Sequence, residues 1–467
     1  LKVGKTNALF ASGEDLIMFA LTSGTTGQAK FIPVTRRFVD DYRRGWNIFG
    51  LKALLDHPNA LFRKIVQITS STREERTPGG LWAGAITGLL AETQKWIVRK
   101  HYVTPPAVAG IKDPLAKCYT IARLAVTEDV AFTSTANPST ILRLAQVMGD
   151  HSDQLIRDVH DGTLRPPGKT AQHLADDLHP MLAAAPACAR RLEKIAARAG
   201  RLVPRDVWQL EFLANWTAGT LKLYLARFPE YFGPVPVRDI GLLASEGRFS
   251  IPIDDHTPAG ILEITSNFLE FIPEQGYGRA DPPVLGLADL KLGERYFIVF
   301  SNATGLTRYD LGDLVEVVDF YNQTPMIAFL NKGSHISSVT GEKLSEHQAV
   351  EAMRILSKRL SQRIEHFLLC PHWGDPPYYV LTLEQALADS CHDDIARQYD
   401  AILCDLNIEY RAKRDSLRLA PLKVQRVGDG FFAHDDLKRL ADAGRSEQYK
   451  RKFLLTQPDA DRDLPIL

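Results

Sequence analysis

The distribution of apolar and polar positions near the start of the chain predicts a strand, a loop and a helix in that order. Residues 16–21 are mostly apolar and lead directly into the polar, glycine-rich segment 23–27, which is typical of a strand that ends in a loop. Apolar residues then recur every three or four positions from Phe38 to Phe49. This spacing gives one apolar face and predicts a helix that starts near Thr35.

Similar patterns predict further elements over the first three hundred residues. They indicate strands at 64–69 and 130–133 and helices at 139–148, 187–199 and 218–227. Alternating strands and helices favour an α/β fold with mostly parallel sheets, in which ligands bind at the carboxyl ends of the strands.

The pattern changes after Lys332. The following residues predict a helix with apolar positions from Val350 to Leu360, two strands near 367–369 and 378–383, and a helix near 395–408. We therefore expect a large N-terminal domain at 1–331, a hinge at 332–343 and a smaller α/β C-terminal domain at 344–467.

Composition narrows the possible partners. The 467 residues carry 56 basic and 56 acidic side chains, so the net charge gives no general attraction to nucleic acids or anionic membranes. No uncharged apolar run approaches the length that spans a bilayer. We expect a cytoplasmic protein without nucleic-acid or membrane partners, as a monomer or weak homo-oligomer.

The five cysteines are widely spaced and form no CxxC pair. This spacing predicts neither a disulfide framework nor a zinc site, and it favours a reducing compartment.

The strongest local motif lies at residues 22–30. It brings hydroxyls, glycines and a lysine together, which suits a loop that wraps a polyphosphate with backbone N–H groups, hydroxyls and an ammonium group. It is not a Walker A loop, because Gln28 and Ala29 separate Gly27 from Lys30. A surface turn rich in serine, threonine and glycine is the alternative.

A second motif, at residues 241–247, contains Ser245 and Glu246. It nearly matches the G-x-S-x-G nucleophile elbow, but Leu243 occupies a glycine position of that pattern, which weakens a hydrolase interpretation. Glu246, at the end of an apolar stretch, could hold Mg²⁺ or could be a solvated carboxylate in a turn.

Two more motifs follow. Asp313 comes after Gly312 at the start of a predicted strand, where an acid can accept hydrogen bonds from ribose hydroxyls, although acidic turns before strands are common. The segment 332–346 is either a functional boundary or a solvated hinge, and Ser345 is a predicted N-cap of the next helix.

Taken in order, these motifs resemble the adenylate-forming superfamily of acyl and aryl ligases. The segments T-S-G-T-T-G-x-x-K-x-x-P from residue 22, A-S-E-G from 244 and Y-x-x-G-D from 309 resemble a bacterial member of the Gretchen Hagen family of auxin-responsive acyl acid amido synthetases. The resemblance covers residues 15–455. It implies that ATP and a carboxylic acid form an acyl-adenylate, which an amine, usually an amino acid, converts into an amide.

The resemblance also implies roles for individual residues. Glu246 would bind Mg²⁺, and Lys343 and Lys450 would be catalytic lysines that approach the phosphates. The ATP-binding residues would be Ser23, Gly24, Thr25, Thr26, Gly27, Lys30, Ser245, Tyr309, Asp313 and Lys332.

The resemblance further implies that the N-terminal domain binds nucleotide and acyl acid and lacks its first segment here. The C-terminal domain would be mobile. Two positions depart from the family pattern near Lys450, because Lys452 and Phe453 stand where proline and arginine usually follow.

Two other functions stay open. An acyl-CoA ligase would form the same adenylate and use a thiol acceptor. A non-catalytic nucleotide-binding module would use the same motifs without turnover.

Overall fold

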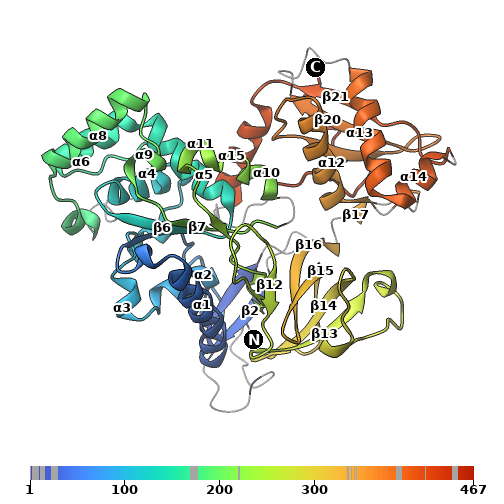
Figure 1. Ribbon diagram of the computed structural model, residues 1–467, viewed down its shortest axis with the longest axis horizontal. Helices are drawn as coiled ribbons and strands as arrows, with labels where there is room; N and C mark the ends of the chain where they lie inside the picture. The colour runs from blue at the N-terminus through green and yellow to red at the C-terminus, as the bar shows by residue number, and fades with distance from the viewer. Residues whose placement is uncertain are drawn as a thin grey trace. The chain divides into compact units, whose positions relative to one another are not determined.

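The computed structural model describes most of the chain. The described residues are 2, 10, 16–22, 30–168, 177–218, 221–333, 336–337, 339–340, 342, 344–384, 392–415, 417–443 and 451–467. The chain divides into two compact units, of which the first comprises residues 1–311, 315–329 and 443–448. The second comprises 312–314, 330–442 and 449–467 (Figure 1).

A four-stranded parallel sheet forms one part of the first unit. It consists of β3 (Lys64–Gln67), β6 (Val130–Ser134), β7 (Phe212–Ala214) and β8 (Val237–Arg238), in that order. Figure 1 shows helices packed together on one side of it. These helices are α4 (Pro114–Ala125), α5 (Pro138–Asp150), α6 (Ser152–Asp161) and α8 (Pro186–Ala199), which share one apolar core with β3 and β6.

The first predicted strand and helix are confirmed. β1 (Leu16–Thr22) pairs antiparallel with β2 (Lys30–Thr35) and parallel with β5 (Trp82–Gly84), and β5 pairs with β4 (Glu75–Arg76). α1 (Arg36–Asp56) starts after Thr35, whose side-chain oxygen accepts a hydrogen bond from the N–H of Phe38. That bond satisfies a helix-end donor, so the start of α1 is set locally.

The helix predicted at 218–227 is wrong in its extent. The described residues form α10 (Lys222–Leu225) and then α11 (Phe228–Phe232), which has Pro229 in its first turn. α10 ends at Leu225 with Ala226 as its C-cap, so the predicted helix is interrupted before Arg227.

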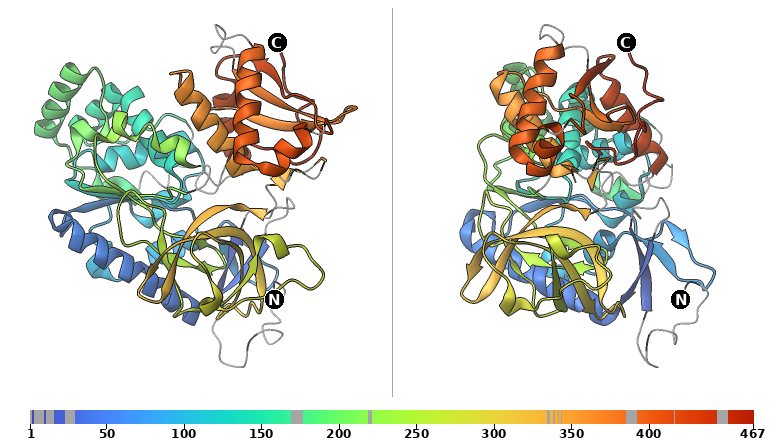
Figure 2. Two further views of the ribbon diagram at one scale, coloured as in Figure 1. Left: turned by 45° about the vertical axis from the view of Figure 1, so that its right-hand side comes forward. Right: turned by 90° about the vertical axis from the view of Figure 1, so that its right-hand side faces the viewer.

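A six-stranded sheet lies mostly in the first unit, and only its residues 312–314 and 330–332 belong to the second. Its order is β11 (Ser250–Ile251), β12 (Gly260–Leu262), β16 (Thr324–Lys332), β15 (Tyr309–Tyr321), β14 (Arg295–Asn302) and β13 (Asn267–Pro273). The β11–β12, β12–β16 and β13–β14 pairs are antiparallel, and the strands curl round one another in the two views of Figure 2. The mixed α/β class with a parallel sheet is therefore confirmed, while this second sheet is built from antiparallel pairs.

The second unit is smaller and also α/β. Its sheet contains β19 (Leu368–His372), β20 (Tyr378–Glu384) and β21 (Lys423–Val427), with β20 antiparallel to β19 and parallel to β21. Its helices are α12 (Glu346–Arg359), α13 (His392–Leu406), α14 (Ile408–Asp415) and α15 (Phe431–Ala443).

Two helix boundaries in this unit follow from side-chain caps. Ser345 and Gln348 form the capping box that starts α12, as predicted for Ser345. The helix predicted near 395–408 is confirmed as α13, which ends before Asn407; the side-chain oxygen of Asn407 accepts the N–H of Tyr410 and starts α14. The hinge at 332–343 stays a prediction.

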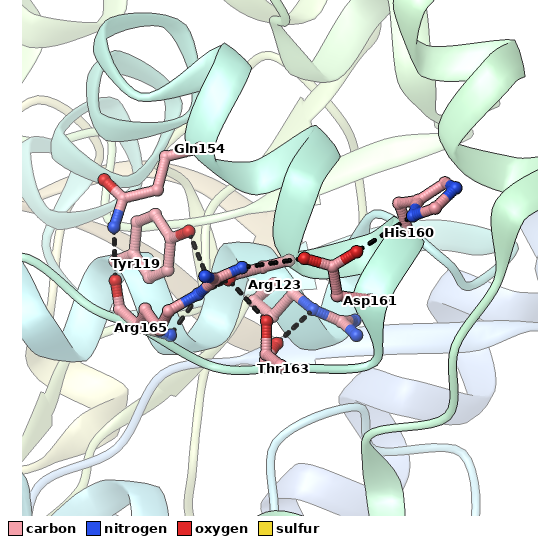
Figure 3. Close-up of polar contacts among 8 residues, drawn as sticks. Tyr119, Arg123, Gln154, His160, Asp161, Thr163 and Arg165 are labelled. Atoms are coloured by element: carbon pink, nitrogen blue, oxygen red, sulfur yellow. Dashed lines mark hydrogen bonds and ion pairs between the residues drawn. The ribbon is translucent and has the colours of Figure 1, made fainter.

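A buried carboxylate network joins α4 and α6. Asp158 is fully buried on α6 and accepts hydrogen bonds from Tyr119, Thr163 and Arg165, and Arg123 donates to the carbonyl of Thr163 (Figure 3). Burial alone raises the pKa of Asp158, but the donors around it outweigh burial and lower the pKa below its ordinary value. Every oxygen is satisfied within the fold, so this network is structural.

Among the helices that the structure describes, none is both long and apolar enough to cross a membrane.

Candidate functional site

Ser245 and Glu246 form the turn of a short hairpin. β9 (Leu243–Ala244) pairs antiparallel with β10 (Gly247–Arg248), and Ala244 lies opposite Gly247. A nucleophile elbow requires a strand, a turn and then a helix, whereas here a second strand follows the turn. Ser245 therefore lacks the geometry of a hydrolase nucleophile, and the buried Glu246 is the chemically distinctive residue.

Side chains from three other elements fix this hairpin. The phenol of Tyr42 on α1 donates to the carbonyl of Ala244 at 3.3 Å. Asn302 at the end of β14 donates to the carbonyl of Glu246 at 2.8 Å, and Asn267 at the start of β13 donates to the carbonyl of Arg248 at 2.7 Å. The position of Glu246 is thus set by the six-stranded sheet and α1 together.

Gly247 is required by close packing at the same turn. A Cβ atom there would lie 3.2 Å from the side-chain oxygen of Asn267 and 3.3 Å from the side-chain nitrogen of Asn302. The sequence pattern predicted Ser245 and Glu246 but not these asparagines, because single asparagines far along the chain carry no local signature.

Arg248, the last residue of β10, anchors the hairpin to neighbouring segments. Its buried guanidinium donates to the carbonyls of Ile240 and Ser250 and lies 4.8 Å from the ring centre of Trp46 on α1. Burial lowers the pKa of Arg248 to about 10. A Cβ atom at Gly45 on α1 would lie 2.4 Å from Cδ of Arg248, so the glycine makes room for the arginine.

Lys30 lies beside Tyr309 in the same unit. Lys30 begins β2, Tyr309 begins β15, and Nζ of Lys30 is 3.0 Å from the phenolic oxygen. The hydrogen bond with Tyr309 raises the pKa of Lys30, and the nearby carboxylates of Glu246 and Asp310 add to the shift. Lys30 therefore stays cationic close to Glu246, an arrangement suited to an anionic ligand that also carries a divalent cation.

Asp313 and Lys332 form an ion pair in the second unit. Nζ of Lys332 lies 2.5 Å from one carboxylate oxygen of Asp313. Asp313 is 3% exposed, and its position on β15 is four residues after Tyr309. The structure thus brings two of the predicted ATP-binding residues into direct contact.

Several predicted site residues lie outside the described residues. These are Ser23, Gly24, Thr25, Thr26, Gly27, Lys343 and Lys450. The segment directly after Lys450 is described: Arg451 is buried and pairs with Asp436, and the N–H of Phe453 donates to the carboxylate of Glu346. Lys452, between them, is exposed.

Comparison with solved structures shows which proteins share this fold. The chain matches 2-hydroxyisobutyryl-CoA ligase, solved in the postadenylation state with 2-HIB-AMP, with a TM-score of 0.51 and 13% identity over 96% of this chain and 75% of that chain. GH3.15 acyl acid amido synthetase matches with a TM-score of 0.83 and 19% identity, over 100% of this chain and 84% of that chain. The fold is that of adenylate-forming enzymes.

Sequence models identify the family. The GH3 family N-terminal domain matches residues 1–237, the central domain 260–332 and the C-terminal domain 347–459. The chain belongs to the GH3 family, so the family resemblance of its motifs is confirmed.

The named relatives are plant enzymes. Jasmonoyl–L-amino acid synthetase JAR6 of Nicotiana attenuata is 26% identical over 450 residues, which cover 90% of this chain and 76% of the relative. Indole-3-acetic acid-amido synthetase GH3.10 of Arabidopsis thaliana is 23% identical over 96% of this chain and 81% of the relative. A bacterial origin stays a prediction.

Proposed function

We propose that this protein is an ATP-dependent acyl acid amido synthetase. It adenylates a carboxylic acid with release of pyrophosphate and then transfers the acyl group to an amine, forming an amide and AMP. Membership of the GH3 family supports this function, and the family match covers most of the chain. The structural observation that carries it is Lys30 held beside Tyr309 and close to the buried Glu246.

The chemistry of the first step explains these residue types. A carboxylate is a poor electrophile, and its transfer to AMP creates a good leaving group. Negative charge builds on the phosphorus oxygens as pyrophosphate departs, so fixed cations and N–H donors accelerate the step. Lys30 would supply one cation, and the loop residues Ser23–Gly27 would supply further donors.

Glu246 fits a magnesium ligand. Mg²⁺ prefers oxygen ligands and usually takes one or two carboxylates together with substrate phosphates. Glu246 is a buried carboxylate in a turn that Asn302 fixes. Lys30 lies nearby and would contact the same phosphates of ATP. When bound, Mg²⁺ would neutralise phosphate charge.

The remaining residues would complete the nucleotide site. Asp313 would accept hydrogen bonds from the ribose hydroxyls, and Lys332 would hold its carboxylate in position through their ion pair. Lys343 and Lys450 would approach the reacting phosphate, each on a C-terminal domain that moves between the two steps.

The acceptor separates this proposal from its alternatives. An amino acid acceptor is supported by the names of the plant relatives. A CoA acceptor is the alternative, since a CoA ligase shares the fold.

The test uses the purified full chain in two stages. Carboxylic acids are first screened for acid-dependent exchange between ATP and pyrophosphate, and the active acid is then incubated with ATP and either amino acids or CoA. The proposal expects exchange and an amide product identified by mass spectrometry. A thioester alone would establish the CoA ligase, and absence of exchange across aromatic, aliphatic and cyclic acids would favour the non-catalytic module.

A further inference from the structure

Three side chains with metal-binding atoms lie together in the second unit, and none of them is among the residues proposed to act on ATP. Cys370 and His372 are alternate residues of β19 and therefore share one side of the strand. Asp461 lies in the C-terminal segment 451–467. One ligand atom of each residue lies within 4.8 Å of the others. Cys370 and Asp461 are buried, whereas the side chain of His372 is 16% exposed.

Backbone pairing brings the C-terminal segment to this strand. The N–H of Leu455 donates to the carbonyl of Leu369 at 2.9 Å, and the N–H of Asp459 donates to the carbonyl of Pro371 at 2.8 Å. Asp461 therefore reaches the cluster because the main chain runs alongside β19.

The orientation of His372 is the second observation. Its Nδ1 atom lies 3.0 Å from a carboxylate oxygen of Asp459. A carboxylate at this position holds a proton on Nδ1, so that Nε2 presents its lone pair on the opposite side of the ring. This is the arrangement in which proteins orient histidine as a metal ligand.

Nε2 of His372 faces Oδ1 of Asp461. The two atoms lie 2.8 Å apart, yet neither has a hydrogen-bond partner among the described residues. Two lone pairs at this distance repel each other, so the approach needs a positive charge. A second proton on the imidazole would supply that charge by donating to Asp461, and a metal ion would supply it while also accounting for the thiol of Cys370 at the same point.

The other oxygen of Asp461 is already engaged. Gln425 on β21 donates to Oδ2 of Asp461 at 2.9 Å and also to the hydroxyl of Thr382 at 2.9 Å. This contact orients the carboxylate and leaves Oδ1 for the cluster.

The ligand types select the metal. Magnesium and calcium prefer oxygen ligands, whereas a set of thiolate, imidazole and carboxylate suits zinc. We infer that Cys370, His372 and Asp461 bind one zinc ion, with Asp459 orienting the imidazole. Solvent would supply the fourth ligand past the partly exposed His372. The ion would tie the C-terminal segment to β19.

The cysteine spacing alone predicts no zinc site, since the familiar patterns require closely spaced cysteine pairs. Here a single cysteine and a histidine on one strand meet an aspartate that lies far along the chain. The inferred site therefore differs from the expectation drawn from cysteine spacing, because spacing rules describe local ligand pairs only.

The experiment measures metal binding and does not depend on the proposed enzymatic activity. The full chain without a histidine tag is freed of metal by chelation and titrated with Zn²⁺ against a chromogenic chelator, and bound metal is counted by mass spectrometry. We expect one zinc per chain and a higher melting temperature with zinc. With Co²⁺ in its place, we expect thiolate-to-cobalt charge-transfer absorption.

Variants test each ligand against a matched control. Cys370→Ser and His372→Gln should each weaken zinc affinity at least about a hundredfold, and Asp459→Asn should weaken it about 10- to 100-fold, the range for residues that orient a ligand. Cys404→Ser, in the same unit, should bind zinc like the wild type.

Two results would overturn the inference. One is a folded wild-type protein that binds neither Zn²⁺ nor Co²⁺, which would leave only a buried thiol beside a histidine–aspartate ion pair. The other is unchanged zinc binding in Cys370→Ser. If a ligand variant fails to fold, the cobalt spectrum of the wild type and the affinity of Asp459→Asn still decide.

Discussion

The ammonium group of Lys30 lies 3.0 Å from the phenolic oxygen of Tyr309, although 279 residues separate them in the chain. One residue comes from the lysine end of the glycine-rich motif and the other from the tyrosine of the Y-x-x-G-D motif. A side-chain contact between strands of two different sheets thus joins two motifs that the sequence shows only as separate segments.

The first prediction concerns this pair. Lys30→Ala should lower the rate of acyl-adenylate formation at least about a hundredfold, because it removes a cation that stabilises developing phosphate charge. Tyr309→Phe removes one hydrogen bond and should lower the rate only about two- to tenfold. Pyrophosphate exchange measures both. The exposed Lys112, changed to alanine, serves as the control, and an equal loss in Lys112→Ala would contradict a specific role for Lys30.

The second prediction tests Glu246. Glu246→Gln keeps the shape and removes the charge, so adenylation should need a higher Mg²⁺ concentration and should partly recover as Mg²⁺ is raised. Exchange rates measured over a series of Mg²⁺ concentrations reveal the shift. Glu193→Gln, at an exposed position of α8, should retain the wild-type dependence. An unaltered Mg²⁺ dependence in Glu246→Gln would contradict the proposal that Glu246 binds Mg²⁺.

The third prediction compares two glycines of α1. Gly45→Ala places a methyl group against Arg248 and should destabilise the protein by about 1–3 kcal/mol. At Gly50 no atom lies within 4 Å of the added Cβ, so Gly50→Ala should stabilise by about 0.5–1 kcal/mol through helix propensity. Urea unfolding gives both values. If Gly45→Ala stabilises the protein as much as Gly50→Ala does, Arg248 moves aside without an energetic cost, which would contradict the prediction.

The fourth prediction uses the buried network of Asp158. Asp158→Asn should destabilise the protein by about 2 kcal/mol or more near neutral pH, the scale of lost hydrogen bonds to a charged group. The folded-state pKa of Asp158 is lowered, so its stabilisation is full above the ordinary aspartate pKa of about 4 and is lost as the pH falls further.

Urea unfolding of wild type and variant at several pH values checks this dependence. The difference in stability between the two proteins should shrink in acid. Asp161→Asn, which changes a half-exposed carboxylate nearby, should have a smaller effect. A difference that stays constant with pH would contradict a role for the charge.

The fifth prediction separates the two half-reactions. If the C-terminal domain delivers Lys450 to the phosphate and then moves, Lys450→Ala should slow adenylate formation while amide formation from supplied acyl-adenylate stays nearly intact. Single-turnover kinetics measure each step.

Lys452→Ala is the matched variant, because Lys452 is exposed between the anchored Arg451 and Phe453. A selective defect in Lys452→Ala instead of Lys450→Ala would move the role to Lys452. Equal loss in both half-reactions would argue against the moving domain.

The sequence by itself determined the local elements and the order of the motifs. α1 follows from apolar spacing and the Thr35 cap, and α12 follows from the Ser345 cap, because capping bonds join residues only three positions apart. The motifs around Lys30, Glu246 and Asp313 were equally visible, because each is contiguous in the chain. Family membership required no more than these segments.

Only the tertiary structure decided what surrounds the motifs. Asn302 holds the carbonyl of Glu246, and Gly45 makes room for Arg248, through contacts between elements far apart in the sequence. The meeting of His372 with Asp461 likewise depends on the C-terminal segment pairing with β19. Such contacts depend on which strands pair and which elements pack together, and the local pattern of apolar residues does not record those partners.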